Sequence, residues 1–87
     1  MGLSGLNFYR YDMFKDKERK TLKRFGSRVA QLRRAKSLTQ EQLASKSGLD
    51  RMTIALIENG RRWPRLSTLE ALAGALNVKL QDFFKEL

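Results

Sequence analysis

The chain has 87 residues, with 18 lysines and arginines against nine acidic residues, which gives a net charge of +9 at pH 7. This length accommodates one compact domain with a modest core, for which short helices are the simplest construction. Cysteine and histidine are absent, which excludes disulfides, zinc fingers and histidine-based catalysis.

The positive charge is concentrated in the first half of the chain. Residues 10–36 hold eleven basic and three acidic residues, a balance of +8, whereas residues 37–87 hold seven and six, a balance of +1. Such a block attracts polyanions such as nucleic acid or lipid head groups, although a solvated basic face is the simpler alternative. No apolar stretch is long enough for a membrane span, and residues 7–14 do not resemble a signal peptide. We therefore expect a cytoplasmic protein without a membrane partner.

Residues 1–18 are predicted to form an arm, because their apolar residues follow neither helical nor strand periodicity. A flexible tail, a contact for a protein partner and a remnant of cloning are the three interpretations left open. A first helix is predicted over residues 19–36, with Gly26 as its weak point. Its apolar stripe should line the core and consists of Leu22, Phe25, Val29 and Leu32.

Two short capped helices are predicted between residues 39 and 58, in the pattern of a helix-turn-helix. Thr39 and Gln42 are spaced as a capping box, in which each side chain binds a backbone N–H of the other residue. Gly48 can end the first helix in the left-handed conformation, and Asp50 is a favourable N-cap for the second.

The second of these helices, residues 51–58, has apolar residues on two opposite faces. Ile54 and Ile57 share one face, while Met52 and Leu56 lie nearly opposite. A helix buried on two sides would explain this pattern. We favour a surface for the DNA major groove, where arginine pairs with guanine and apolar side chains contact thymine methyl groups.

The remaining chain predicts a basic loop followed by two more helices. Asn59 and Gly60 should end the preceding helix, and Pro64 should keep the loop non-helical. Residues 67–70 have the spacing of a second capping box, which predicts the start of the fourth helix. Asn77 should end that helix. No segment alternates with the period of a strand, so we predict an all-α, five-helix fold.

The last helix, beginning at about Lys79, carries more apolar surface than one core contact uses. We expect at least one of its two phenylalanines to pack in the core and the remaining surface to contact a second subunit. The predicted dimer interface comprises Leu80, Phe83, Phe84 and Leu87.

Several segments resemble the Cro/CI-type (XRE) helix-turn-helix family of phage and plasmid repressors. The resemblance covers about residues 22–87 and rests on LTQEQLA at 38–44, IENGRR at 57–62 and LEALAGALNV at 69–78. It implies a lambda-repressor-like DNA-binding domain over residues 19–87. A narrower similarity, in LDR at 49–51 and IENGRRWPRL at 57–66, is to the dimeric controller proteins of restriction-modification operons. The chain departs from the family pattern at Lys79, where serine or threonine normally caps the last helix, and at Trp63.

The resemblance also implies roles for individual residues. It assigns base reading to Arg51, Met52 and Leu56. The positions that would hold the DNA backbone are Gln40, Thr53, Asn59, Arg61 and Arg62. For Gln40, Arg51 and Arg62, ordinary surface exposure is the alternative. Arg33 and Glu58 match an ion pair that, in phage repressors, orients the recognition helix, which here is the predicted helix at residues 51–58. Neither residue is expected to touch a base.

These observations favour a transcriptional regulator that binds a palindromic operator in double-stranded DNA as a homodimer. An antitoxin-like protein, which regulates its own operon while its arm neutralises a toxin partner, is the alternative. An enzyme is not expected, because the nine carboxylates form no catalytic or metal-binding pattern. No cofactor or metal is predicted.

Overall fold

The computed structural model describes residues 3–85 and 87, with side chains described from Lys15 onward. The described part is all-α, as predicted, and contains no strand. Its elements are α1 Leu3–Ala35, α2 Gln40–Ser47, α3 Arg51–Glu58, α4 Leu66–Leu76 and the 3-10 helix η1 Leu80–Phe84. Four α-helices and one 3-10 helix therefore replace the five helices expected, because the last predicted helix forms only a short 3-10 segment.

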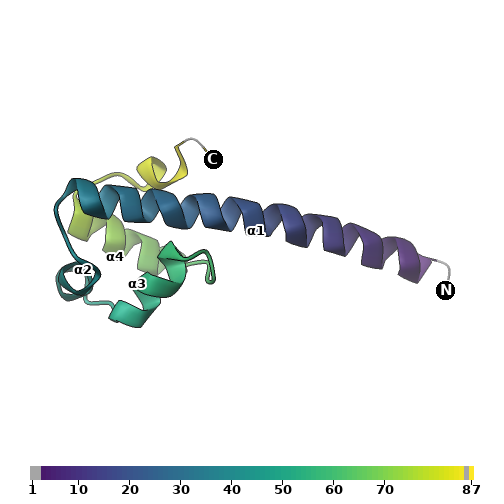
Figure 1. The fold of residues 1–87 in the computed structure, drawn as a ribbon, viewed down its shortest axis with the longest axis horizontal. Coiled ribbons are helices and arrows are strands. Elements are labelled where there is room, and N and C mark those ends of the chain that lie inside the picture. Colours follow the sequence, from purple (N-terminus) through teal and green to yellow (C-terminus); the bar gives the residue numbers. More distant parts are fainter. Residues whose placement is uncertain (1–2, 86) are drawn as a thin grey trace.

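Helix α1 is longer than predicted and projects well beyond the other helices (Figure 1). Its 33 residues account for the 52 Å long axis of a molecule that otherwise measures 25 by 18 Å. The predicted start at residue 19 is wrong. Residues 6–25 contain neither glycine nor proline, so a helix nucleated on the core can extend outward by one hydrogen bond per residue.

The division into an arm, residues 1–18, and a domain, residues 19–87, remains a prediction. The structure gives these 18 residues no boundary of their own, because α1 continues from residue 3 to residue 35 without interruption. Residues 1, 2 and 86 and the side chains of residues 3–14 lie outside the described part. A contact between the arm and a protein partner is therefore still untested.

The ends of α2 follow the local sequence. The Gln42 N–H donates to Thr39 Oγ1 at 3.1 Å, and the Thr39 N–H donates to Gln42 Oε1 at 2.8 Å, so the predicted capping box is confirmed. Gly48 ends α2 with φ +74°. Asp50 occupies the N-cap of α3 as predicted, but its side chain makes no capping hydrogen bond.

Helix α4 begins earlier than the second capping box predicted. Arg65 is the N-cap residue and α4 starts at Leu66, so Ser67 lies inside the first turn, where it cannot act as an N-cap. The predicted box at residues 67–70 is therefore wrong. Asn77 ends α4 in the left-handed conformation, with φ +55°, as expected.

Asp82 caps the start of η1. A lysine ammonium group has no acceptor, so Lys79 cannot perform this role. Instead Asp82 Oδ2 accepts the Lys79 N–H at 2.8 Å, and Asp82 Oδ1 lies 2.9 Å from Lys85 Nζ. The hydrogen bond from Lys85, followed by that from the Lys79 N–H, lowers the pKa of Asp82. The carboxylate therefore stays ionised at neutral pH.

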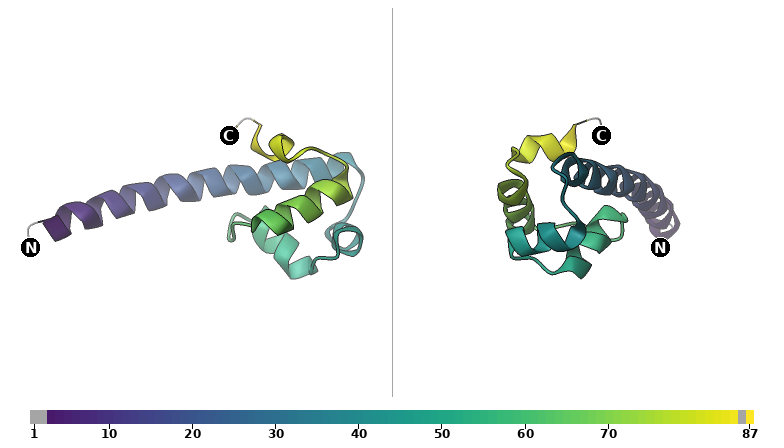
Figure 2. Two further views of the ribbon diagram at one scale, coloured as in Figure 1. Left: turned by 180° about the vertical axis from the view of Figure 1, so that it is seen from behind. Right: turned by 60° about the vertical axis from the view of Figure 1, so that its left-hand side comes forward.

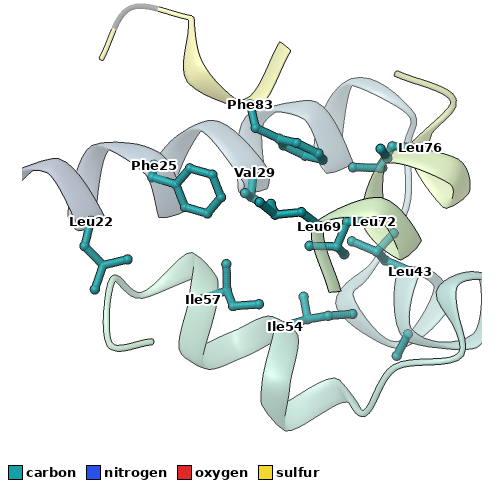
Figure 3. Close-up of a cluster of buried hydrophobic side chains, with 12 residues drawn as sticks. Leu22, Phe25, Val29, Leu43, Ile54, Ile57, Leu69, Leu72, Leu76 and Phe83 are labelled. Carbon is teal, nitrogen blue, oxygen red and sulfur yellow. The ribbon is translucent and has the colours of Figure 1, made fainter. Parts of the chain in front are cut away.

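The core lies where α1 crosses the other helices (Figure 3). All four residues of the predicted α1 stripe contribute, with Leu32 only partly buried. Helix α3 and η1 pack on different sides of α1, as both views in Figure 2 show. The large side chains of the cluster are Leu22, Phe25, Val29, Leu43, Ile54, Ile57, Leu69, Leu72, Leu76 and Phe83.

At Gly26 the backbones of α1 and α3 lie close together. A Cβ atom at this position would lie 2.3 Å from the Ile57 carbonyl oxygen and 2.7 Å from that of Glu58. Backbone atoms cannot move aside as a flexible side chain can. Gly26 is therefore needed for packing, and its low helix propensity is the cost of that contact.

We predict that Gly26→Ala lowers the free energy of unfolding by about 1–3 kcal/mol, because the added methyl group overpacks the α1–α3 contact. Gly74→Ala is the matched control, since a Cβ atom at Gly74 meets nothing within 4 Å. That change should raise the stability by up to about 1 kcal/mol through helix propensity. Urea denaturation measures both, and stabilisation by both substitutions would contradict the proposed role of Gly26.

Candidate nucleic-acid interface

Helix α3 has one buried face and one exposed face. Ile54 and Ile57 are completely buried, as predicted, on a helix that packs against α1 and α2, whereas Met52 is 59% exposed. Arg51 is exposed beside Met52, while Leu56 is half-buried at the edge of the same helix. The two-faced pattern in the sequence therefore does not reflect burial on both sides, because Met52 remains open to solvent.

A buried ion pair connects α1 to the end of α3. Arg33 Nε lies 2.7 Å from Glu58 Oε2, and Arg33 Nη2 lies 2.9 Å from Glu58 Oε1. Arg33 Nη1 also donates to the Leu38 carbonyl oxygen at 2.7 Å. The side chains of Arg33 and Glu58 are only 10% and 4% exposed. Such a bidentate pair fixes both the position and the rotation of α3 relative to α1.

The positive charge of Arg33 does not change with pH in the physiological range. The hydrogen bond with Glu58 raises the pKa of Arg33 above its ordinary value, against the opposing effect of burial. The guanidinium is therefore protonated throughout the physiological pH range. This geometry agrees with the structural role expected for Arg33 and Glu58.

Gln40 joins the same network, which the sequence analysis did not anticipate. Its Nε2 donates to Glu58 Oε1 at 3.1 Å, so the first residue of α2 is tied to the last residue of α3. The amide group has a second N–H, which can still serve a ligand at the start of α2. Glu58 thereby holds both helices of the helix-turn-helix in one arrangement.

The loop after α3 carries several exposed polar and basic side chains. Asn59, Arg61 and Arg62 are all exposed. A recess of about 430 Å³ lies next to this loop, and its lining joins Thr53 on α3 to Arg62. Thr53 and Arg62, predicted as separate backbone contacts, therefore border one concave site.

Three further polar residues line this recess and were not predicted as site residues, namely Arg65, Ser67 and Thr68. They lie at the start of α4, where the N-cap residue makes no side-chain capping bond. Uncapped N–H groups and basic side chains attract anions. No local signal marked them, because the recess forms only where α3, the loop and the start of α4 meet.

Trp63 anchors the basic loop to the core. Its ring centroid lies 5.4 Å from that of the buried Phe25, although 40% of the tryptophan remains exposed. This contact holds the backbone between Arg62 and Arg65 against α1. The departure from the family pattern at Trp63 thus has a structural role.

The predicted dimer residues differ in exposure. Phe83 is completely buried and packs beside Phe25, so it leaves the predicted interface and belongs to the core. Leu80 and Phe84 are 37% and 47% exposed, and Leu87 is half-buried. This agrees with the expectation that one of the two phenylalanines packs internally.

The described residues hold neither a helix suited to crossing a bilayer nor a cluster of potential metal ligands. A family profile described as "Helix-turn-helix" matches residues 29–83. The chain belongs to this family. Its members of the Cro/CI type are DNA-binding regulators and not enzymes.

Individual relatives are regulators of several kinds. The immunity repressor protein of Bacillus phage phi105 is 49% identical over 61 residues, which are 70% of this chain and 42% of that protein. The chain thus spans less than half the length of the phage repressor. The control protein C.MunI from Mycoplasma is 37% identical over 65 residues, covering 74% of this chain and 88% of that protein.

One solved structure is similar to this chain over almost the whole length of the solved protein. The restriction-modification controller protein C.AhdI from Aeromonas hydrophila superimposes with a TM-score of 0.71 at 43% identity, covering 72% of this chain and 96% of that one. This controller protein is therefore similar to the domain in both sequence and fold.

We predict that Glu58→Ala lowers the free energy of unfolding by about 3–5 kcal/mol, because Arg33 is left as an uncompensated buried charge. The double variant Arg33→Met with Glu58→Leu should lose much less, since it removes both charges and keeps apolar volume. Urea denaturation of the single variants Arg33→Met and Glu58→Leu and of the double variant completes the cycle. Additive losses would show that the pair is not coupled.

Proposed function

We propose that this protein is a sequence-specific regulator of transcription, which binds a palindromic operator in double-stranded DNA as a homodimer. The observation that carries this proposal is the exposed face of α3. Arg51 and Met52 are exposed to solvent there, while the opposite face of the helix is buried in the core. A protruding helix of this kind fits the major groove, whose base edges offer distinct donors, acceptors and methyl groups.

Base reading is assigned to the exposed face of α3 and its edge. Arg51 can donate two hydrogen bonds to guanine, and Met52 and Leu56 offer apolar contact to thymine methyl groups. The ion pair and Gln40 hold this face at one angle to the rest of the domain. Reading of bases requires that precision, because one bidentate contact depends on both position and direction.

Backbone contacts are assigned to residues around this helix. Arg61, Arg62 and Asn59 follow α3, while Gln40 and Thr53 lie at the starts of α2 and α3. Arg65 joins this set because it shares the recess of Thr53 and Arg62. Phosphate contacts from several directions would fix the register of the protein on the duplex without reading its sequence.

The exposed apolar residues of η1 support the homodimer. Leu80 and Phe84 are large exposed hydrophobic side chains on one five-residue element, and Leu87 lies close by in the chain. A single recognition helix reads few bases, so a two-fold dimer that reads two half-sites gains specificity. The relatives include controller proteins of restriction-modification systems and a phage repressor. Neighbouring genes for a methyltransferase and an endonuclease would identify the controller role.

We predict that Arg51→Ala costs roughly 1–3 kcal/mol of binding free energy on the operator and leaves binding to a scrambled duplex nearly unchanged. Arg62→Ala is the matched control, which should weaken binding to both duplexes equally and lower the salt slope by about one. Selection from random duplexes supplies the operator, and gel-shift titration measures the affinities. Equal losses on both duplexes for Arg51→Ala would refute the assignment of base reading.

We also predict that Phe84→Glu converts the dimer into a monomer and lowers operator affinity, because it places a charge in the apolar interface. Helical content should not change, since the ring is about half exposed. Leu66→Glu is the control for oligomeric state, because Leu66 is 64% exposed but lies on α4. Sedimentation velocity distinguishes the species. A Phe84→Glu protein that still sediments as a dimer would place the interface elsewhere.

A further inference from the structure

The side of α1 that faces α3 continues toward the N-terminus as a row of basic residues. Gly26 lies against the Ile57 and Glu58 carbonyl oxygens at the end of α3. Lys23 and Arg19 follow on α1 at spacings of three and four residues, which keep them on the same side of the helix. Seven residues separate Arg19 from Gly26, or about 10 Å along the helix axis. The row therefore extends outward from the end of the recognition helix.

Lys23 lies against the loop that follows α3. A Cβ atom at Gly60 would be 2.9 Å from Lys23 Cα and 2.9 Å from Lys23 Cγ, so the loop and this turn of α1 are in close contact. The residues on either side of Gly60 are Asn59 and Arg61, which are both exposed and both assigned to contacts with the DNA backbone. Lys23 is therefore a direct neighbour of the proposed phosphate contacts.

The charges of Arg19 and Lys23 are available to a ligand. Both residues are exposed, and neither forms an ion pair within the part of the chain that the structure describes. The surrounding segment is also basic, because residues 15–24 hold six basic and two acidic residues, a balance of +4. Like charges four residues apart on a helix repel each other. A bound polyanion would remove that repulsion.

We propose that Arg19 and Lys23 bind phosphates of the DNA backbone outside the base pairs that α3 reads. This assignment rests on the proposed function, which places the duplex along the exposed face of α3. The loop would hold the phosphates nearest that helix, and Arg19 lies about 10 Å further out than Gly26, roughly the length of three base pairs. Figure 1 shows α1 continuing well past α3 in this direction. Such contacts add affinity that does not depend on the flanking sequence.

Operator duplexes of two lengths test this proposal. The shorter one ends at the last base pair that selection from random duplexes fixes on each side, and the longer one adds about one helical turn of arbitrary sequence at each end. The double variant Arg19→Gln with Lys23→Gln should bind the longer duplex at least about ten-fold more weakly than the unchanged protein does. On the shorter duplex the two proteins should bind nearly equally. Glutamine retains the aliphatic stem of Lys23 that lies against Gly60.

The double variant Lys17→Gln with Arg24→Gln is the matched control. It removes one lysine and one arginine from exposed positions of the same helix, but helical periodicity places them on another side of α1. This control should retain most of its affinity for both duplexes. If circular dichroism shows that the first double variant does not fold, Arg19→Gln alone repeats the test and should weaken binding to the longer duplex only.

Equal losses for the Arg19–Lys23 variant and the Lys17–Arg24 control would overturn the proposal, because the attraction would then depend on net charge alone. A loss of the same size on both duplexes would also overturn it, since the contacts would then lie inside the operator. So would an unchanged protein that binds both lengths equally. Arg51→Ala should weaken binding to both lengths by the same factor, so a failure of base reading remains distinguishable from a failure of the flanking contacts.

Discussion

Gly26 lies against the last carbonyl groups of α3, and Arg33, two turns further along the same face of α1, pairs with Glu58 at the end of the same helix. The first contact sets how closely the helices approach, and the second sets the direction of α3. Because an eight-residue helix cannot hold itself in place by its own hydrogen bonds, its exposed face has a defined orientation only through α1. The proposed reading of DNA depends on this attachment.

Phe25 connects the two surfaces to which function is assigned. Its buried ring lies 5.4 Å from Trp63 in the basic loop and 5.4 Å from Phe84 on η1, measured between ring centroids. One core residue of α1 thus supports both the proposed phosphate contacts and the proposed dimer surface. Two recognition helices in a dimer must keep a fixed separation, and a rigid aromatic connection between interface and loop would help to maintain it.

Much of the site could be predicted from the sequence because its signals are local. The capping pair Thr39 and Gln42 and the left-handed Gly48 depend only on neighbouring residues, and they define where α2 begins and ends. Ile54 and Ile57 follow helical periodicity, which is why their burial was predictable. The start of α4 was not, because Ser67 is the residue type that favours an N-cap, whereas Arg65 occupies that position without a side-chain capping bond.

By itself, the sequence determined the helical class, the helix-turn-helix and the excess of positive charge upstream of it, since composition and short-range spacing carry these properties. Only the tertiary structure decided which of Phe83 and Phe84 is buried, why residue 26 is glycine, and that Gln40 binds Glu58. It also brought Lys23 against Gly60 in the loop after α3. The physical reason is the same in each case: these properties arise between segments far apart in the chain, where the packing of α1 against α3 and η1 sets the distances.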